Sequence, residues 1–192
     1  MKNNIPDRIP DRAECEELMA RYSMLPNIVE HSLQVMRVSL AVTDHLQDGV
    51  YVNRDLVAAA ALLHDITKTR SLTTKERHAA SGGVLLRELG FLRVAEIVEQ
   101  HVIIQNMDLE ERLQEMEIVY YADKRVMHDK IVTIDERVHD LIRRYATGEQ
   151  IRDQIIRNKE QALIVERKIA GFMKISIQDA LELILRRNNN SQ

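Results

Sequence analysis

The pattern of apolar and polar positions along the chain predicts a series of helices joined by short connections. We expect them near residues 11–22, 27–47, 53–65, 76–89, 92–104, 109–129, 134–146, 149–171 and 177–187. The stretch 53–65 is dense in alanine and leucine, so it should be buried on most sides. The charged, periodic segment 150–187 fits either a dimerisation helix or a helix covering the core, and we favour the second.

Local signals mark where several of these helices begin and end. Three pairs resemble capping boxes: Asp11 with Glu14, Thr133 with Glu136, and Ser176 with Asp179. Asn27 with Glu30 is a weaker version of this signal, and Asn53 is expected to cap the alanine-rich helix. Gly90 and Gly148 lie where left-handed C-caps would end helices.

Composition supports one all-α domain. The chain has 192 residues, of which 45% are hydrophobic and 30% charged, and only 6 are glycine and 3 proline. So few turn-forming residues disfavour β-sandwiches and barrels. We expect an N-terminal helix and linker over 1–26, a helical-bundle domain over 27–146, and additional C-terminal helices over 147–192 packed on the same core.

Charge and cysteine content narrow the classes of partner. The formal net charge is −3, no basic block occurs, and aromatic residues are only 4%, so no nucleic-acid surface is indicated. The apolar run that contains Val57–Leu63 is too short to span a bilayer, and no membrane partner is expected. The single cysteine, Cys15, excludes an internal disulfide and fits a reducing compartment, so we expect a cytoplasmic protein.

Several polar side chains fall where an apolar helix face should continue. Asp123 shares a predicted helix face with Val119 and Met127, four residues before and after it. His64 and Asp65 directly follow the apolar run of the alanine-rich helix. An ionised carboxylate facing the core is costly unless it is paired or binds a metal.

Two further histidines follow the same pattern. His101 shares the face of Ile97 and Val98, and His31 begins the long helix over 27–47. Any one of these residues alone fits a hydrogen-bonded core side chain. As a set without a thiolate, imidazole and carboxylate groups indicate a divalent first-row metal used in hydrolysis. The remaining histidines, His45, His128 and His139, are not expected to join them.

The arrangement of these residues resembles the HD-domain metal-dependent phosphohydrolases. The resemblance rests on His31 in NIVEHSLQV, His64 and Asp65 in ALLHDITK, and Asp123 in YYADKR, and it covers residues 27 to about 137. It implies a helical bundle in which ligands from four helices meet at one metal. No GYP tripeptide occurs, which disfavours the HD-GYP branch, and Thr67 replaces the glycine of the common HDIG form.

His78, in HAASG, and His101 are similar to the additional ligands of the dinuclear branch, which includes symmetrical diadenosine tetraphosphate hydrolases. The resemblance implies that Asp65 bridges two metals, with His31, His64 and Asp123 on the first and His78 and His101 on the second. One or two divalent ions are expected, with Mn, Fe, Co or Ni favoured over Mg or Zn. The chain departs from that branch after the third histidine, where it reads HVIIQN.

The implied function is hydrolysis of a phosphoester or phosphoanhydride bond in a small, nucleotide-like phosphorylated substrate by a metal-activated water. Asp65 and Lys68 are the candidate catalytic residues, Lys68 and Lys124 the candidate substrate-binding residues, and Arg137 is interpreted as a surface charge of its helix. Two alternatives are a catalytically silent HD regulatory or binding module and a di-iron oxygenase on the same scaffold. The exact substrate, the native metal and a homodimeric state are left open.

Overall fold

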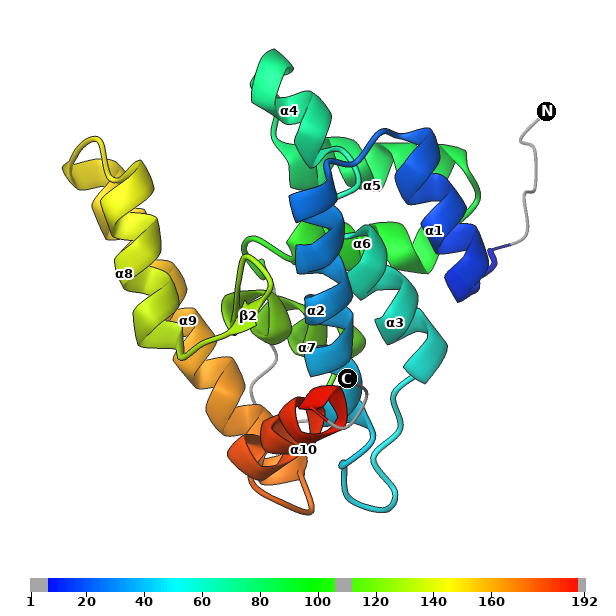
Figure 1. The fold of residues 1–192 in the computed structure, drawn as a ribbon, viewed down its shortest axis with the longest axis vertical. Helices are drawn as coiled ribbons and strands as arrows, with labels where there is room; N and C mark the ends of the chain where they lie inside the picture. Colours follow the sequence, from blue (N-terminus) through cyan, green and yellow to red (C-terminus); the bar gives the residue numbers. More distant parts are fainter. Residues whose placement is uncertain (1–6, 106–111, 190–192) are drawn as a thin grey trace.

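The structure is a computed structural model that describes residues 7–105 and 112–189. Its helices are α1 (Arg12–Arg21), α2 (Pro26–Thr43), α3 (Arg54–Leu63), α4 (Lys68–Thr74), α5 (His78–Glu88), α6 (Leu92–Gln100), α7 (Glu115–Lys124), α8 (Ile134–Tyr145), α9 (Glu149–Phe172) and α10 (Ile177–Asn189). Two short antiparallel strands, β1 (Val126–Met127) and β2 (Lys130–Ile131), follow α7 (Figure 1). The all-α prediction is confirmed. None of the described helices combines the length and the apolar composition that crossing a membrane requires.

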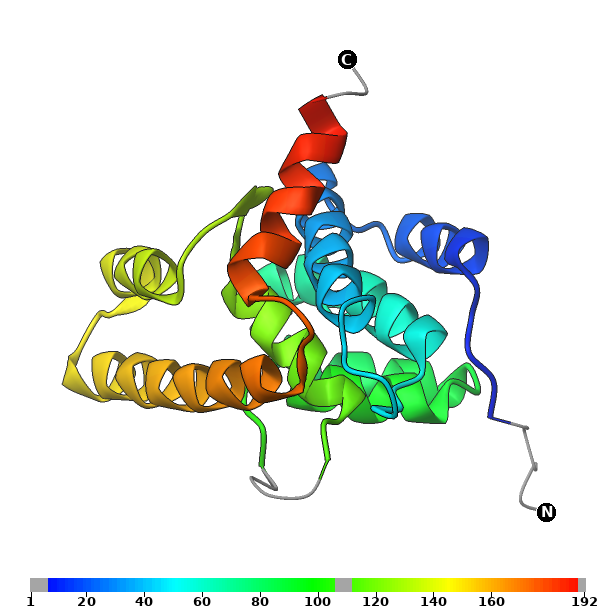
Figure 2. The same cartoon turned by 90° about the horizontal axis from the view of Figure 1, so that it is seen from below.

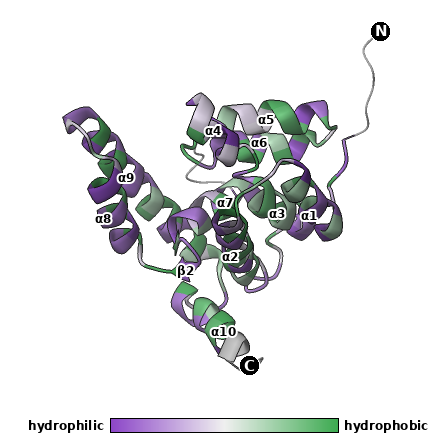
Figure 3. Ribbon diagram, turned by 45° about the horizontal axis from the view of Figure 1, so that its top comes forward, coloured by the Kyte–Doolittle hydropathy of each residue, from purple (hydrophilic) through white to green (hydrophobic). Residues whose placement is uncertain are grey.

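Helix α3 lies at the centre of the packing. It contacts α1, α2, α6 and α7, and its alanines allow those neighbours to approach closely. Ala60 and Leu63 have no exposed surface, and Figure 3 shows α3 as largely hydrophobic. The expected burial of this helix on most sides is confirmed. The residues that follow its C-terminal end therefore lie in the interior of the bundle.

Most of the predicted helix starts are confirmed. The side chains of Asp11, Asn53, Thr133 and Ser176 each accept a hydrogen bond from the backbone N–H three residues later, at 2.9 to 3.2 Å. Each of these bonds satisfies an N–H that has no partner within the helix. The left-handed glycine expected at the end of α5 is also confirmed, since Gly90 follows the C-cap residue Leu89 and has φ +86°.

Two predicted caps are wrong. Helix α2 begins at Pro26 with Leu25 as its N-cap and no side-chain cap, so Asn27 lies inside the first turn. Proline is favoured at this first position because it lacks the N–H that a cap would satisfy. Gly148 has φ −171° and precedes α9 as its N-cap, whereas α8 has already ended at Tyr145, with Ala146 as its C-cap.

The structure also corrects two predicted boundaries. The helix expected over 109–129 begins at Glu115 and ends at Lys124, and residues 109–111 lie outside the described part. The chain then turns through the β1–β2 hairpin, where His128 has φ +58°. Helix α4 was not predicted because it has no buried residue, and so no apolar periodicity to reveal it.

Helices α8 and α9 form a hairpin beside the rest of the bundle (Figure 2). α9 contacts both α8 and α7, so it joins the hairpin to the core. On α9 the side chains of Ile155 and Ile169 are buried, whereas Ile156 is 37% exposed. α10 then packs against α2. Residues of α7 and of the hairpin line the two sides of a cleft that is described below.

Close packing of α5 on α6 depends on Gly83. A Cβ atom at this position would overlap the side chain of Glu99, which forms an ion pair with Arg87. We expect Gly83→Ala to lower the free energy of unfolding by about 1–3 kcal/mol, since the Glu99 side chain must move. Gly171→Ala is the matched control, because a Cβ on that α9 residue has no neighbour within 4 Å. It should stabilise the helix by up to about 1 kcal/mol.

Urea unfolding of the two glycine variants checks this prediction. An equal effect of both substitutions on the urea concentration at the unfolding midpoint would show that close packing of α5 on α6 does not depend on Gly83.

Candidate metal centre

Six histidine and aspartate side chains from distant parts of the chain meet at the end of α3. They are His31 on α2, His64 and Asp65 directly after α3, His78 at the start of α5, His101 directly after α6, and Asp123 on α7. All except His78 are buried, and the His78 side chain is 24% exposed. The structure thus brings together every residue that the sequence predicts as a metal ligand.

The first group consists of His31, His64 and Asp65, whose ligand atoms lie within 4.8 Å of one another. Asp123 joins this group from α7. Its Oδ1 is 3.0 Å from His31 Nε2 and 3.8 Å from His64 Nε2. Two imidazoles and two carboxylates therefore converge on one small volume.

The second group consists of Asp65, His78 and His101, also within 4.8 Å of one another. Asp65 Oδ1 is 3.2 Å from His78 Nε2 and 3.6 Å from His101 Nε2, and the two Nε2 atoms are 3.2 Å apart. The other oxygen of Asp65, Oδ2, lies 3.5 Å from His64 Nε2. Asp65 thus presents one oxygen to each group.

Backbone carbonyls orient three of the four histidines. His31 Nδ1 lies 2.9 Å from the carbonyl of His128, His64 Nδ1 lies 2.7 Å from that of Ala61, and His101 Nδ1 lies 2.6 Å from that of Val98. A carbonyl can only accept, so each Nδ1 carries the proton. Each ring then turns its Nε2 toward the site, which is the usual arrangement of metal-binding histidines.

Two buried polar atoms at the meeting point of the groups are unsatisfied. His64 Nε2 and Asp65 Oδ1 are inaccessible to solvent and have no hydrogen-bond partner. Buried polar atoms without partners are rare and costly in folded proteins. A divalent cation would satisfy both atoms, so the residues present fit the metal that this donor set implies.

The two carboxyl groups of the cluster are kept ionised, as metal binding requires. Burial raises the pKa of Asp65, but the charges of Lys68 and His64 outweigh it, and the pKa falls well below its usual range. Asp123 behaves similarly, with Lys124 and His31 opposing burial. Burial lowers the pKa of His101 to about 4, so this imidazole is neutral at neutral pH and free to act as a ligand.

Two lysines accompany the carboxylates. Lys68 Nζ lies 3.0 Å from Asp65 Oδ2, and its side chain is 36% exposed. Burial lowers the pKa of Lys68, the carboxylates of Asp65 and Asp123 raise it more, and Arg137 opposes them; the net shift is upward. Lys124 Nζ donates to Asp123 Oδ2 at 2.8 Å and to the His101 carbonyl at 2.9 Å. Lys124 therefore holds two parts of the cluster together.

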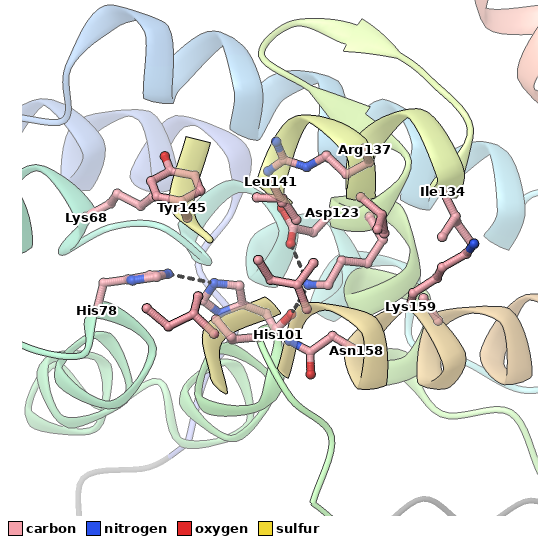
Figure 4. A pocket seen from close by; sticks show the side chains of 16 residues that line it. Lys68, His78, His101, Asp123, Ile134, Arg137, Leu141, Tyr145, Asn158 and Lys159 are labelled. Carbon is pink, nitrogen blue, oxygen red and sulfur yellow. Dashed lines mark hydrogen bonds and ion pairs between the residues drawn. The ribbon is translucent and has the colours of Figure 1, made fainter. Parts of the chain in front are cut away.

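A cleft of about 230 Å³ opens on one side of the cluster. Lys68, His78, His101, Asp123 and Lys124 form its inner end, and residues of α8 and α9 form its outer wall (Figure 4). This volume lies slightly below the roughly 300–1,000 Å³ of typical small-ligand pockets. The site is therefore open to a small ligand.

The structure corrects the interpretation of Arg137 as a surface charge. Its side chain is only 14% exposed and lines the cleft from α8. The signal for this was present in the sequence. Ile134, Val138, Leu141 and Tyr145 recur at helical spacing and all line the cleft, and Arg137 lies within this stripe.

Thr67 has a positioning role that the sequence did not indicate. Its hydroxyl donates to the His78 carbonyl at 2.8 Å and lies 2.9 Å from the Ser81 hydroxyl. These contacts tie the segment that carries Asp65 to the first turn of α5. The side chains of His128 and His139 are exposed, and that of His45 bonds to the Ala41 carbonyl of α2, as expected of side chains outside the cluster.

Comparison with known proteins places this geometry in a family. Residues 28–127, more than half of the chain, match the family described as HD domain. No solved structure matches the chain significantly.

The curated relatives that the chain matches differ in what they are named. A tRNA (cytidine(56)-2'-O)-methyltransferase of Picrophilus torridus is 28% identical over 67% of this chain and 40% of its own length. A dihydroneopterin 2',3'-cyclic phosphate phosphodiesterase of Methanocaldococcus jannaschii is 43% identical over 26% of this chain and 20% of its own. The chain thus spans less than half the length of these two relatives.

An uncharacterized protein of Methanocaldococcus jannaschii is similar over a larger share. It is 33% identical over 57% of this chain and 72% of its own length. Together with the match over residues 28–127, this likeness shows that the chain belongs to the HD-domain family.

Proposed function

We propose that the protein is a metal-dependent phosphohydrolase that cleaves a phosphoester or phosphoanhydride bond of a small nucleotide-like substrate. The observation that carries the proposal is the meeting of two His/Asp groups at Asp65, beside a cleft that His78, His101 and Lys68 line. Membership of the HD-domain family and the phosphodiesterase relative support hydrolysis in particular.

His31, His64, Asp65 and Asp123 would hold one divalent ion, and Asp65, His78 and His101 a second. Such ions lower the pKa of a bound water and neutralise charge on phosphoryl oxygens. The imidazole-rich donor set favours Mn, Fe, Co or Ni over Mg. The proximity of His78 and His101 supports the dinuclear branch to which diadenosine tetraphosphate hydrolases belong.

The chain's own cations would orient the substrate. Lys68 is partly exposed at the inner end of the cleft and lies beside Asp65, so its ammonium group can contact a phosphate oxygen next to the ligands. Lys124 already donates to two acceptors, which leaves one of its three protons for a substrate oxygen. We therefore assign phosphate binding first to Lys68 and a supporting part to Lys124.

The complete set of ligands also favours an enzyme over a silent regulatory module. A module that had lost turnover would be expected to lack one or more of these six side chains. The phosphodiesterase relative favours hydrolysis over oxygen chemistry. Measurement of oxygen consumption by the iron-loaded protein would separate a di-iron oxygenase from a hydrolase.

The direct test is a substrate screen. Protein loaded with Mn, Fe, Co or Ni is incubated with nucleoside 2',3'-cyclic phosphates, dinucleoside polyphosphates and phosphomonoesters, and product masses are recorded. We expect one of these classes to be consumed only when metal is present. Absence of product with every metal, from folded protein with its metal sites filled, would contradict the proposed function.

A further inference from the structure

The outer wall of the cleft comes from a part of the chain outside the HD match. The match ends at residue 127, whereas α8 and α9 begin at Ile134 and Glu149. The matched region therefore supplies the metal ligands and the two lysines, and the α8–α9 hairpin supplies the surface that faces them. What the hairpin presents to the cleft should decide which substrate fits.

Of the two cations that the hairpin presents to the cleft, Lys159 is paired with Asp135 at 2.6 Å, which leaves Arg137. Its Nε is inaccessible to solvent and has no hydrogen-bond partner. Within the described residues, its guanidinium forms one ion pair, with Asp140 Oδ2 at 3.7 Å, which is longer than a hydrogen bond. A guanidinium carries five N–H donors. Arg137 is thus held near the cleft with most of its donors unused.

The neighbours of Asp140 explain why Arg137 is left with spare donors. Asp140 Oδ1 accepts from Arg143 at 3.0 Å, and its Oδ2 accepts from Arg144 at 3.2 Å. Both carboxylate oxygens are therefore engaged by arginines that project from later turns of α8. Asp140 fixes the position of Arg137 through charge, and the planar fork of the arginine remains available to an oxyanion.

Beside Arg137 most of the wall is apolar, and Asn158 and Lys159 are its polar residues. Val138, Leu141 and Tyr145 line it from α8, and Ile151, Ile155 and Ala162 line it from α9. Tyr145 is 50% exposed and Ile151 is 44% exposed, although both are large apolar side chains. Such a surface next to a row of cations suits a ligand with an anionic end and an apolar or aromatic end.

We propose that Arg137 binds a phosphate oxygen of the substrate from the side opposite the His/Asp cluster, and that the apolar wall of α8 and α9 contacts the organic group of the same molecule. The substrate class is a phosphoester of a flat heterocycle, such as a nucleoside phosphate, rather than a small polar phosphate ester. This inference rests on the proposed function but concerns binding, so it can be tested without turnover.

The test is calorimetric titration of inorganic phosphate and of AMP into protein in excess Mn²⁺. We expect Arg137→Ala to weaken the binding of both ligands about 10- to 100-fold, because a charge-assisted hydrogen bond to phosphate is lost. Arg137→Lys should recover part of this affinity. Arg152→Ala is the matched control, since Arg152 is an exposed arginine of α9 in the same hairpin and does not line the cleft. The affinity of this control variant for phosphate and for AMP should equal that of the parent.

The apolar wall is tested by a second pair of variants. Leu141→Ala should weaken AMP binding several-fold and leave phosphate binding unchanged, whereas Ile142→Ala, at the neighbouring position outside the cleft lining, should change neither. Circular dichroism and melting curves establish that each variant is folded.

The outcomes separate this inference from the proposed function. If phosphate and AMP bind in an Arg137-dependent way but no ester is hydrolysed, the binding site stands and the proposed function fails. If an ester is hydrolysed and Arg137→Ala retains the parent KM and phosphate affinity, the inference is wrong. Failure of the parent to bind either ligand, or equal binding of AMP and phosphate with no effect of Leu141→Ala, also overturns it.

Discussion

Asp65→Asn should reduce hydrolysis by more than about a thousandfold, the largest effect expected of any single substitution in this chain. Asp65 is the one residue shared by both His/Asp groups, and each of its oxygens faces a different group. Asparagine keeps the shape of the side chain but removes its charge and replaces one oxygen with a donor that cannot bind a cation. The measurement is kcat/KM on the substrate found in the screen.

Asp55→Asn is the matched control for charge. Asp55 lies in the first turn of α3, the helix that Asp65 follows, and is exposed, so its loss should leave the rate within a factor of about two, as for surface substitutions generally. Equal rates for Asp65→Asn and the parent, with both folded, would remove Asp65 from the active site.

Replacing His78 by alanine should lower the metal content of the saturated protein from two ions to one. His78 and His101 belong only to the second group, whereas His31, His64 and Asp123 can hold the first ion without them. The side chain of His78 is 24% exposed, so its removal should disturb packing less than the removal of buried His101. Elemental analysis after equilibrium dialysis gives the stoichiometry.

His139→Ala serves as the control for this experiment. His139 is exposed on α8 and lies outside the cleft, so the variant should retain both ions. A parent protein that never exceeds one ion at saturation, together with normal turnover in His78→Ala, would make the second group structural.

The predictable parts of the fold are those governed by local chemistry. Asp11, Asn53 and Thr133 cap their helices as expected, since a cap depends on residues only three positions apart. The alanine-rich α3 is buried because its apolar residues surround the whole helix. The turn after Lys124 was not predictable in this way, because no glycine or proline marks it and His128 adopts the left-handed conformation itself.

The candidate metal ligands could be predicted because a buried charge on an apolar face demands a partner. Asp123 and His101 each interrupt a run of core residues, and the structure places both beside Asp65 or its neighbours. Periodicity along one helix cannot show what faces that helix across a cleft. For this reason the role of Arg137, which depends on the distance between α8 and α7, required the three-dimensional arrangement.

In this arrangement the two parts of the chain contribute different residues to the site. The bundle that matches the HD family holds the His/Asp cluster, while the α8–α9 hairpin closes the cleft with residues of its own. Relatives that share the cluster can therefore act on different substrates if their walls differ.

The melting temperature tests most directly whether the His/Asp cluster binds divalent metal in the folded protein. A ligand that binds only the folded state at a hundredfold excess over its Kd stabilises it by about 2.7 kcal/mol. For a chain of this size that corresponds to a rise in Tm of roughly 5–10 °C. We expect chelator-stripped protein to show this rise when Mn, Fe, Co or Ni is added, and to lose it on renewed chelation. A melting temperature that none of these metals changes would contradict the account.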